Sequence, residues 1–300
     1  MPELPFLEVL AENLASRVSG RRIESILIRQ PALLQTSAPA PESFVGEFLS
    51  LPGRVGKYLI LETESRRAIV IHLMRAGRLA VTPSPGSGAE RGAPGKGRVA
   101  RGPALPKHLS ARIAFDDGTR LDLVEHGKEK RARLWLAEDS SDVPELGRLG
   151  PDPSRGELTY ERFRSAMEAA SRRLKTFLTD QRAIAGIGNG LSDEILYEAR
   201  LSPMRLTGSL TEPEARALHL ALLAVVSAQT EKLRESMSGE LPQKEPREHY
   251  RVHDHAGTKC PRCGAAIARV SFADHDIFYC PGCQTGGKPL KDRRLSKLLK

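Results

Sequence analysis

Four cysteines near the end of the chain have the spacing of a metal site. Cys260-Pro-Arg-Cys263 and Cys280-Pro-Gly-Cys283 form two Cys-x-x-Cys pairs separated by sixteen residues. Pairs at this spacing bring four thiolates to one tetrahedral zinc ion, and two disulfides or four unpaired thiols are the alternatives. Because four cysteine ligands leave no open coordination position, the sequence predicts one structural Zn²⁺ that holds a zinc ribbon together.

A glycine-rich turn is a second candidate site. The chain reads Gly-Ile-Gly-Asn-Gly over residues 186–190, directly before a helix predicted from Leu191. Backbone N–H groups at a helix N-terminus, together with the positive end of the helix dipole, favour an anion such as a phosphate. Lys175, on the preceding predicted helix, supplies a charge that could meet the same phosphate. A turn that uses glycine only for tight helix packing is equally compatible with this pattern.

The charge of the chain points to a polyanionic partner. Its 300 residues include 46 basic and 37 acidic ones, which give a formal charge of +9. Hydrophobic residues make up 40% of the chain. The last fifty residues hold ten Lys or Arg against four Asp, a balance of +6. This composition excludes a disordered tail protein. Without an apolar run of about 18 residues or a signal-peptide pattern at the N-terminus, we expect no membrane association and a cytoplasmic protein.

The elements that must position these groups fall into two halves. Apolar residues at helical spacing predict an amphipathic helix over residues 3–18. Seven short apolar runs predict the strands of a β-sandwich, at residues 22–28, 57–62, 68–73, 78–82, 111–115, 120–124 and 133–136. Beyond a Gly-Pro-Asp-Pro break the pattern becomes helical, at residues 159–170, 172–178, 191–199 and 212–234. The fold class predicted is therefore α+β with several domains.

Three further segments complete the organisation. The stretch 83–106 is rich in Gly and Pro and is predicted to be a surface loop. Residues 238–247 are predicted to link the helical half to the cysteine-bearing segment. Between the two cysteine pairs, residues 266–270 and 277–279 predict the two strands of a hairpin.

Four blocks of sequence, in order along the chain, resemble the formamidopyrimidine-DNA glycosylase and endonuclease VIII family. They are Met-Pro-Glu-Leu-Pro at residues 1–5, Val-Gly-Lys at 55–57, the block 174–194 and the ribbon that ends at Gln284. The resemblance implies an N-terminal catalytic domain over 1–149 with a helix and a two-layer β-sandwich. It further implies a helix–two-turn–helix domain over 150–240, a zinc ribbon over 248–286 and a basic tail over 287–300, with DNA enclosed between the lobes.

The resemblance also implies a chemical role for the N-terminus. Once Met1 is removed, Pro2 becomes a secondary amine, and α-amino groups, whose pKa lies near 7.7–8.0, are partly neutral and nucleophilic at physiological pH. Family members attack the sugar C1′ with this nitrogen, expel the damaged base and form an iminium that promotes strand cleavage. Pro2 is then the nucleophile, Glu3 the general acid and Lys57 a second proton donor. Taken alone, Met-Pro-Glu is an ordinary helix start and Lys57 a strand-edge charge.

Other positions match DNA-contacting residues of the family. The set carried over is His72, Arg75, His108, Lys175, Asn189 and His275. Lys175 and Asn189 fall on a pair of family residues that binds phosphate. His72 and His108 could equally be surface histidines that bind no ligand. Departures from the family accompany these matches. Arg75 stands where relatives insert a methionine, Phe6 replaces a glutamate, and His275 replaces a phosphate-gripping arginine. The wedge stretch that ends in phenylalanine reads Glu-His-Gly-Lys-Glu-Lys at 125–130, so we expect no apolar wedge.

The sequence thus predicts a DNA glycosylase with AP lyase activity that acts on damaged DNA in base excision repair. We expect a monomer in the cytoplasm, associated with the nucleoid through DNA. A damage-binding protein of the same fold that has lost excision is the alternative, and a zinc-ribbon RNA-binding protein is a third possibility.

Overall fold

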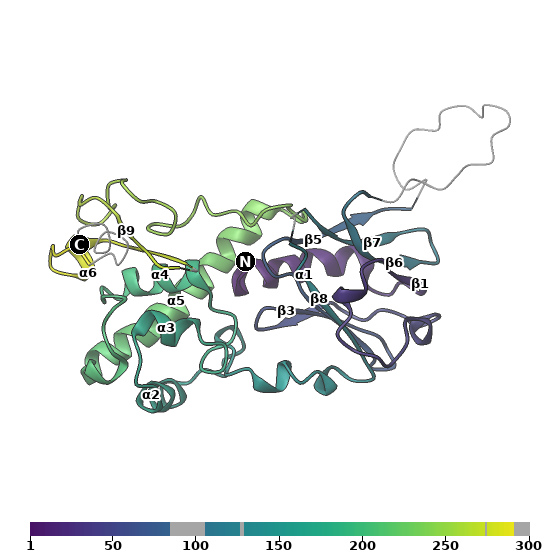
Figure 1. Ribbon diagram of the computed structural model, residues 1–300, viewed down its shortest axis with the longest axis horizontal. Helices are drawn as coiled ribbons and strands as arrows, with labels where there is room; N and C mark the ends of the chain where they lie inside the picture. Colours follow the sequence, from purple (N-terminus) through teal and green to yellow (C-terminus); the bar gives the residue numbers. More distant parts are fainter. Residues whose placement is uncertain (85–105, 127–128, 274, 291–300) are drawn as a thin grey trace.

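The computed structural model describes residues 1–84, 106–126, 129–273 and 275–290. Most of the predicted loop 83–106 and the tail beyond residue 290 therefore lie outside the described residues. The described chain forms two lobes (Figure 1). One lobe holds two β-sheets and α1, the other holds α2 to α5 with the C-terminal hairpin, and the N-terminus lies where the two lobes meet.

The first lobe is built from two antiparallel four-stranded sheets that share a core with α1 (Leu4–Val18). One sheet has the order β1 (Ile23–Ile28), β6 (Leu109–Phe115), β7 (Arg120–Glu125), β5 (Gly77–Thr82). The other has the order β2 (Gly53–Val55), β3 (Tyr58–Glu62), β4 (Ala68–His72), β8 (Arg133–Ala137). The predicted two-layer sandwich and N-terminal helix are confirmed. Among the strands of the described residues, β2 alone was not predicted, because three residues are too few to show an alternating pattern.

The second lobe is helical, as predicted. Its helices are α2 (Tyr160–Ala169), α3 (Leu174–Thr179), α4 (Asn189–Glu198) and α5 (Glu212–Met237). Leu218 and Leu222 of α5 are buried in the core of this lobe, whereas Leu233 and Met237 are buried in the sandwich core. The 26-residue helix α5 therefore joins the two lobes through apolar contacts at both ends.

Single turns of 3-10 helix occur in both lobes, at Pro31–Leu33, Pro41–Phe44, Ser140–Asp142, Leu146–Arg148, Pro153–Arg155 and Thr207–Ser209.

A buried ion pair also joins the lobes. The guanidinium of Arg54, on β2, is 2% exposed and lies 2.5 Å from the carboxylate of Asp152, at the start of the helical lobe. Asp152 also accepts the backbone N–H of Gly56 at 3.2 Å. Because an unpaired buried charge is costly, each partner fixes the other, and the turn that carries Lys57 is thereby tied to the second lobe.

The C-terminal hairpin consists of β9 (Ala268–Ser271) and β10 (Asp276–Tyr279), followed by the short helix α6 (Pro281–Gln284). It is the predicted ribbon hairpin, with strands shifted by one or two residues. Glu194 of α4 is buried, and its carboxylate accepts the backbone N–H groups of residues 251, 252 and 253 at 2.8–2.9 Å. The ribbon is therefore anchored on α4. None of the helices in the described ranges is long and apolar enough to span a bilayer.

Candidate functional site

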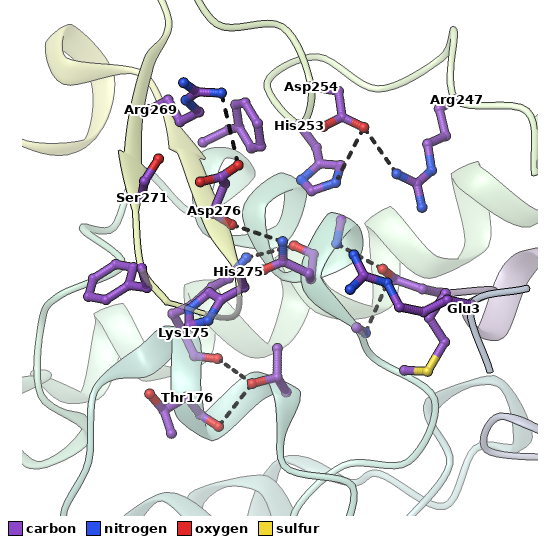
Figure 2. A pocket seen from close by; sticks show the side chains of 18 of the residues that line it. Glu3, Lys175, Thr176, Arg247, His253, Asp254, Arg269, Ser271, His275 and Asp276 are labelled. Carbon is purple, nitrogen blue, oxygen red and sulfur yellow. Dashed lines mark hydrogen bonds and ion pairs between the residues drawn. The ribbon is translucent and has the colours of Figure 1, made fainter. Parts of the chain in front are cut away.

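A cavity of about 830 Å³ lies where the two lobes and the ribbon meet. It is lined by residues of the N-terminus, the β2–β3 and β4–β5 turns, α3, the start of α4, the segment after α5 and the hairpin. In Figure 2, Arg269 and His275 approach from the hairpin and Lys175 from α3. Glu3 and Arg247 lie opposite the hairpin, on the right of the picture. Chain segments that are far apart in the sequence therefore build one polar site.

Glu3 is held by the start of α4. Its carboxylate is 3% exposed and accepts the backbone N–H groups of Gly188 and Gly190 at 2.8 Å each, and that of Leu191 at 3.1 Å. The helix N-terminus therefore does bind an anion, as its sequence predicted, but the anion is this carboxylate and not a phosphate. The phosphate assignment for these three donors was wrong because Glu3, 185 residues away in sequence, already satisfies them.

Two glycines make this approach possible. A Cβ at Gly188 would lie 2.4 Å from Cδ of Glu3, and one at Gly186 would lie 2.7 Å from the side chain of Leu4. Gly186 also has φ of +88°, a conformation that favours glycine, and its carbonyl accepts the Leu4 N–H at 3.1 Å. The glycines of the turn therefore serve close packing against the N-terminal segment.

The N-terminal amine and Lys57 lie in the same buried environment. Pro2 is buried behind Met1, which is 39% exposed and lines the cavity. Burial lowers the pKa of the N-terminal amine of Met1, against the opposing charges of Glu245 and Glu3. Lys57 is 4% exposed, and burial likewise lowers the pKa of its ammonium group. Both groups are thus shifted toward their neutral, proton-accepting forms.

Lys175 and Asn189 lie together, as predicted, but they already have protein partners. The ammonium group of Lys175 is 3% exposed and contacts the carbonyl of Asn189 and the carboxylate of Asp193, each at 2.6 Å. The side-chain amide of Asn189 donates to the carbonyl of Asp276 in the hairpin at 2.8 Å. Among the described contacts, these bonds use two of the three ammonium donors and one of the two amide donors, so each side chain keeps one for a ligand.

The turn between β4 and β5 places Arg75 on the cavity, together with Met74, and the predicted contact of Arg75 with DNA stays a prediction. Met74 has φ of +51°, and its N–H donates to Nδ1 of His72 at 3.1 Å. Burial, with the charges of Lys57 and Arg133, lowers the pKa of His72 to about 4, so the ring is neutral at pH 7. His72 therefore holds this turn and is not among the residues that line the cavity.

The remaining predicted positions divide between the site and the scaffold. His275 is exposed, lines the cavity and stacks on Phe272 with ring centroids 5.1 Å apart. His108 packs against His126 and is not among the lining residues. Phe6 is buried in the sandwich core, a position that favours an apolar side chain.

Glu125, in the stretch that differs from the family wedge, is buried and accepts the N–H groups of Arg131 and Ala132. Its neighbours 127 and 128 lie outside the described residues. The one apolar side chain that the β4–β5 turn presents to the cavity is Met74, one position before Arg75. No pattern in the sequence pointed to this residue.

The four cysteines form the predicted metal centre. Their Sγ atoms all lie within 4.8 Å of one another, with Cys263–Cys280 at 3.4 Å and Cys260–Cys283 at 3.8 Å. A tetrahedral Zn²⁺ with Zn–S bonds of about 2.3 Å needs sulfurs about 3.8 Å apart, so the set fits the ion without disulfides. The hydroxyl of Tyr197 on α4 lies 3.3 Å from Sγ of Cys260, which links the metal centre to the helical lobe. The zinc is structural.

Comparison with known proteins identifies the family. The formamidopyrimidine-DNA glycosylase N-terminal domain matches residues 1–128, the H2TH domain of the same glycosylase matches 149–238, and a zinc finger found in FPG and IleRS matches 257–286. A formamidopyrimidine-DNA glycosylase of Heliobacterium modesticaldum is 32% identical over 95% of this chain and 100% of its own length. The chain belongs to the formamidopyrimidine-DNA glycosylase family.

Other relatives place the chain within this family. A crystal structure of Lactococcus lactis formamidopyrimidine-DNA glycosylase, bound to DNA that contains an AP site, has a TM-score of 0.77 and is 25% identical, covering 94% of this chain and 99% of that one. A formamidopyrimidine-DNA glycosylase-like protein of Mycobacterium tuberculosis is 42% identical over 53% of this chain and 98% of its own length. The predicted family, fold class and structural zinc are therefore confirmed.

Sequence reasoning missed several residues of this glycosylase-family site. Arg247, His253 and Asp254, which line the cavity, lie between α5 and the metal centre, and Arg269 lies on β9. Arg269 could have been found, because it is a basic residue at alternating spacing on a predicted strand. The others follow no periodic pattern, and only the path of the chain after α5 brings them to the cavity.

Proposed function

We propose that this chain is a DNA glycosylase with AP lyase activity, which excises damaged, oxidised bases through a Schiff base on Pro2. The observation that carries the proposal is the convergence of the N-terminus, Glu3 and Lys57 at one wall of a cavity whose other walls carry the basic side chains Lys175 and Arg269. Such a cavity suits a sugar–phosphate backbone, and its buried wall suits an amine that must be neutral to react.

In the proposed reaction, removal of Met1 exposes the Pro2 nitrogen. That nitrogen bonds to C1′ as the bond from C1′ to the base breaks, and the base leaves with the electron pair and gains a proton. Loss of the amine proton and opening of the sugar ring, with protonation of the ring oxygen, give an iminium. Removal of a C2′ proton then expels the 3′ phosphate and cleaves the strand.

Glu3 and Lys57 supply the proton transfers in this proposal. The Glu3 carboxylate has four lone-pair sites and accepts three N–H bonds, so one site remains for a proton or a sugar hydroxyl. Lys57 approaches the same wall, and burial lowers the pKa of its ammonium group, which makes it a readier proton donor. Lys175, Asn189 and His275 would bind the flanking phosphates with their remaining donors.

Trapping on abasic DNA tests the proposed function. Untagged protein, shown by mass spectrometry to lack Met1, should form a covalent adduct when borohydride reduces the iminium. Protein that carries an uncleaved N-terminal extension should form none, although it should still bind the same DNA. Equal trapping by both forms would contradict Pro2 as the nucleophile.

One feature favours the alternative of a damage-binding protein. Arg75, where relatives carry a methionine, puts a charge into the wall that a wedge would use. Binding without any adduct or excision, by processed protein over a panel of lesions in duplex and single-stranded DNA, would identify this alternative.

A further inference from the structure

A buried carboxylate lies behind the reactive wall of the cavity and has no role in the mechanism above. Glu245 belongs to the irregular segment between α5 and the ribbon, and its side chain is 7% exposed. Its Oε1 accepts the backbone N–H of Glu3 at 3.4 Å, while its Oε2 accepts from the guanidinium of Arg247 at 3.1 Å. One oxygen is therefore held by a cation, and the other faces the N-terminal segment.

The position of Oε1 places it near the Pro2 nitrogen. The amide nitrogen of Glu3 and the nitrogen of Pro2 belong to consecutive residues and lie at most about 3.6 Å apart. Oε1 therefore lies within about 7 Å of the Pro2 nitrogen. A single bridging water spans about 5.5–6 Å, so a rotation of the Glu245 side chain or of the freed N-terminal residue brings the two groups within reach of proton transfer.

Glu3, the other carboxylate nearby, is poorly placed for the same task. Both of its oxygens point to the start of α4, where three backbone N–H groups hold them. Consistent with this division, the charge of Glu245 raises the pKa of the Met1 amine, one residue before Pro2, more than the charge of Glu3 does.

We propose that Glu245 is the proton acceptor for the Pro2 amine, an inference that rests on the proposed function. The secondary ammonium of Pro2 transfers one proton to Oε1, so that an ammonium and a carboxylate become a neutral amine and a carboxylic acid. No other bond forms or breaks in this step, and the neutral amine then attacks C1′.

Burial favours the neutral pair. It raises the pKa of the Glu245 carboxyl and lowers that of the Met1 amine, the N-terminus in this structure, because a desolvated site disfavours charge on both groups; the Pro2 amine exposed by removal of Met1 would lie in the same desolvated region. The ionisable groups that act on Glu245 are the amine, Glu3, Lys57, Arg78, Arg247 and Tyr250. Arg247 keeps the carboxyl from being protonated permanently, so that it can accept and release the proton.

The test compares Glu245→Gln with Glu248→Gln, an exposed glutamate in the same segment. Glutamine keeps the acceptor for the Glu3 N–H but cannot take up the amine proton. Single-turnover trapping of abasic DNA with cyanoborohydride is followed from pH 6 to 9, at several concentrations of imidazole as an external base. Thermal unfolding and binding to DNA with a tetrahydrofuran abasic analogue report the fold of each variant.

For Glu245→Gln we expect trapping to slow roughly 100-fold at pH 6.5, the size of a general-base contribution, and to recover with rising imidazole concentration. Wild-type protein and Glu248→Gln should show neither effect. Wild-type trapping by Glu245→Gln would overturn the proposal but leave Pro2 as the nucleophile, whereas failure of processed wild-type protein to trap would remove the proposed function itself. If Glu245→Gln does not fold, the wild-type protein provides the test. A trapping rate of the wild-type protein that rises with imidazole concentration would overturn the proposal.

Discussion

Replacing Gly188 with alanine should separate the carboxylate of Glu3, the proposed general acid, from the helix that holds it. Gly188 has φ of −121°, which alanine adopts without backbone strain, so the effect comes only from the added methyl group. That methyl would lie 2.4 Å from Cδ and 2.6 Å from Oε1 of Glu3. Since carbon atoms in contact lie about 3.5–4.0 Å apart, the Glu3 side chain must move by about 1 Å.

The cost follows from the bonds that this movement breaks. Glu3 accepts three N–H bonds of 2.8–3.1 Å, and a displacement of about 1 Å takes one or two of them beyond hydrogen-bonding distance. Hydrogen bonds to a charged group contribute about 1.5–3 kcal/mol each. We therefore expect a loss of about 1.5–6 kcal/mol in the free energy of unfolding. We also expect a fall of roughly 100-fold in the rate of base excision, because the proposed general acid is misplaced by about 1 Å.

Urea unfolding and single-turnover excision measure the two quantities. Gly208→Ala is the matched control, since a Cβ at Gly208 meets nothing within 4 Å. The reasoning would be refuted by a Gly188→Ala protein that excises bases and unfolds like the wild type. If the Gly188→Ala protein lost stability but kept full activity, Glu3 would have a structural role and no catalytic one.

Three other perturbations test separate parts of the account. Chelation of zinc, or Cys260→Ala, should unfold the ribbon and abolish DNA binding, and unchanged affinity in a binding titration would contradict a structural metal. Lys175→Met should cost up to about 3–5 kcal/mol in urea unfolding because Asp193 loses its cation and keeps only the ring nitrogen of His253 as a side-chain partner, whereas adding Asp193→Asn should restore part of that stability but not the DNA affinity or its salt dependence. Because the pKa of His72 falls to about 4 on folding, the unfolded chain binds more protons than the folded chain between pH 6.5 and 4. The free energy of unfolding should therefore decrease by up to about 3 kcal/mol as the pH is lowered from 6.5 to 4. Urea unfolding of His72→Asn should lack that part of the pH dependence.

Local patterns in the sequence predicted much of the fold. The spacing of Leu7, Leu10 and Leu14 indicated α1, and the two Cys-x-x-Cys pairs indicated the metal centre, because both signals lie within short segments. The anion at the start of α4 was misassigned for the opposite reason. Nothing near Gly188 in the sequence indicates that Glu3 satisfies its N–H group across 185 residues.

The same limit applies to Glu245 and to the pair of Arg54 and Asp152. Glu245 lies in a segment without periodicity, and its burial depends on how the chain returns from α5 past the N-terminus. Arg54 and Asp152 are charged residues, which sequence patterns place on the surface, yet they are buried because they neutralise each other at the junction of the lobes. Long-range pairing of this kind needs the tertiary structure.

The attachment site of DNA in the trapped complex tests the central claim most directly. Processed protein is reduced with borohydride on abasic DNA and digested, and the cross-linked peptide is sequenced by mass spectrometry. The account predicts that the sugar is attached to the nitrogen of Pro2, in the peptide that begins Pro-Glu-Leu. Attachment to Lys57, or to any other lysine, would contradict it.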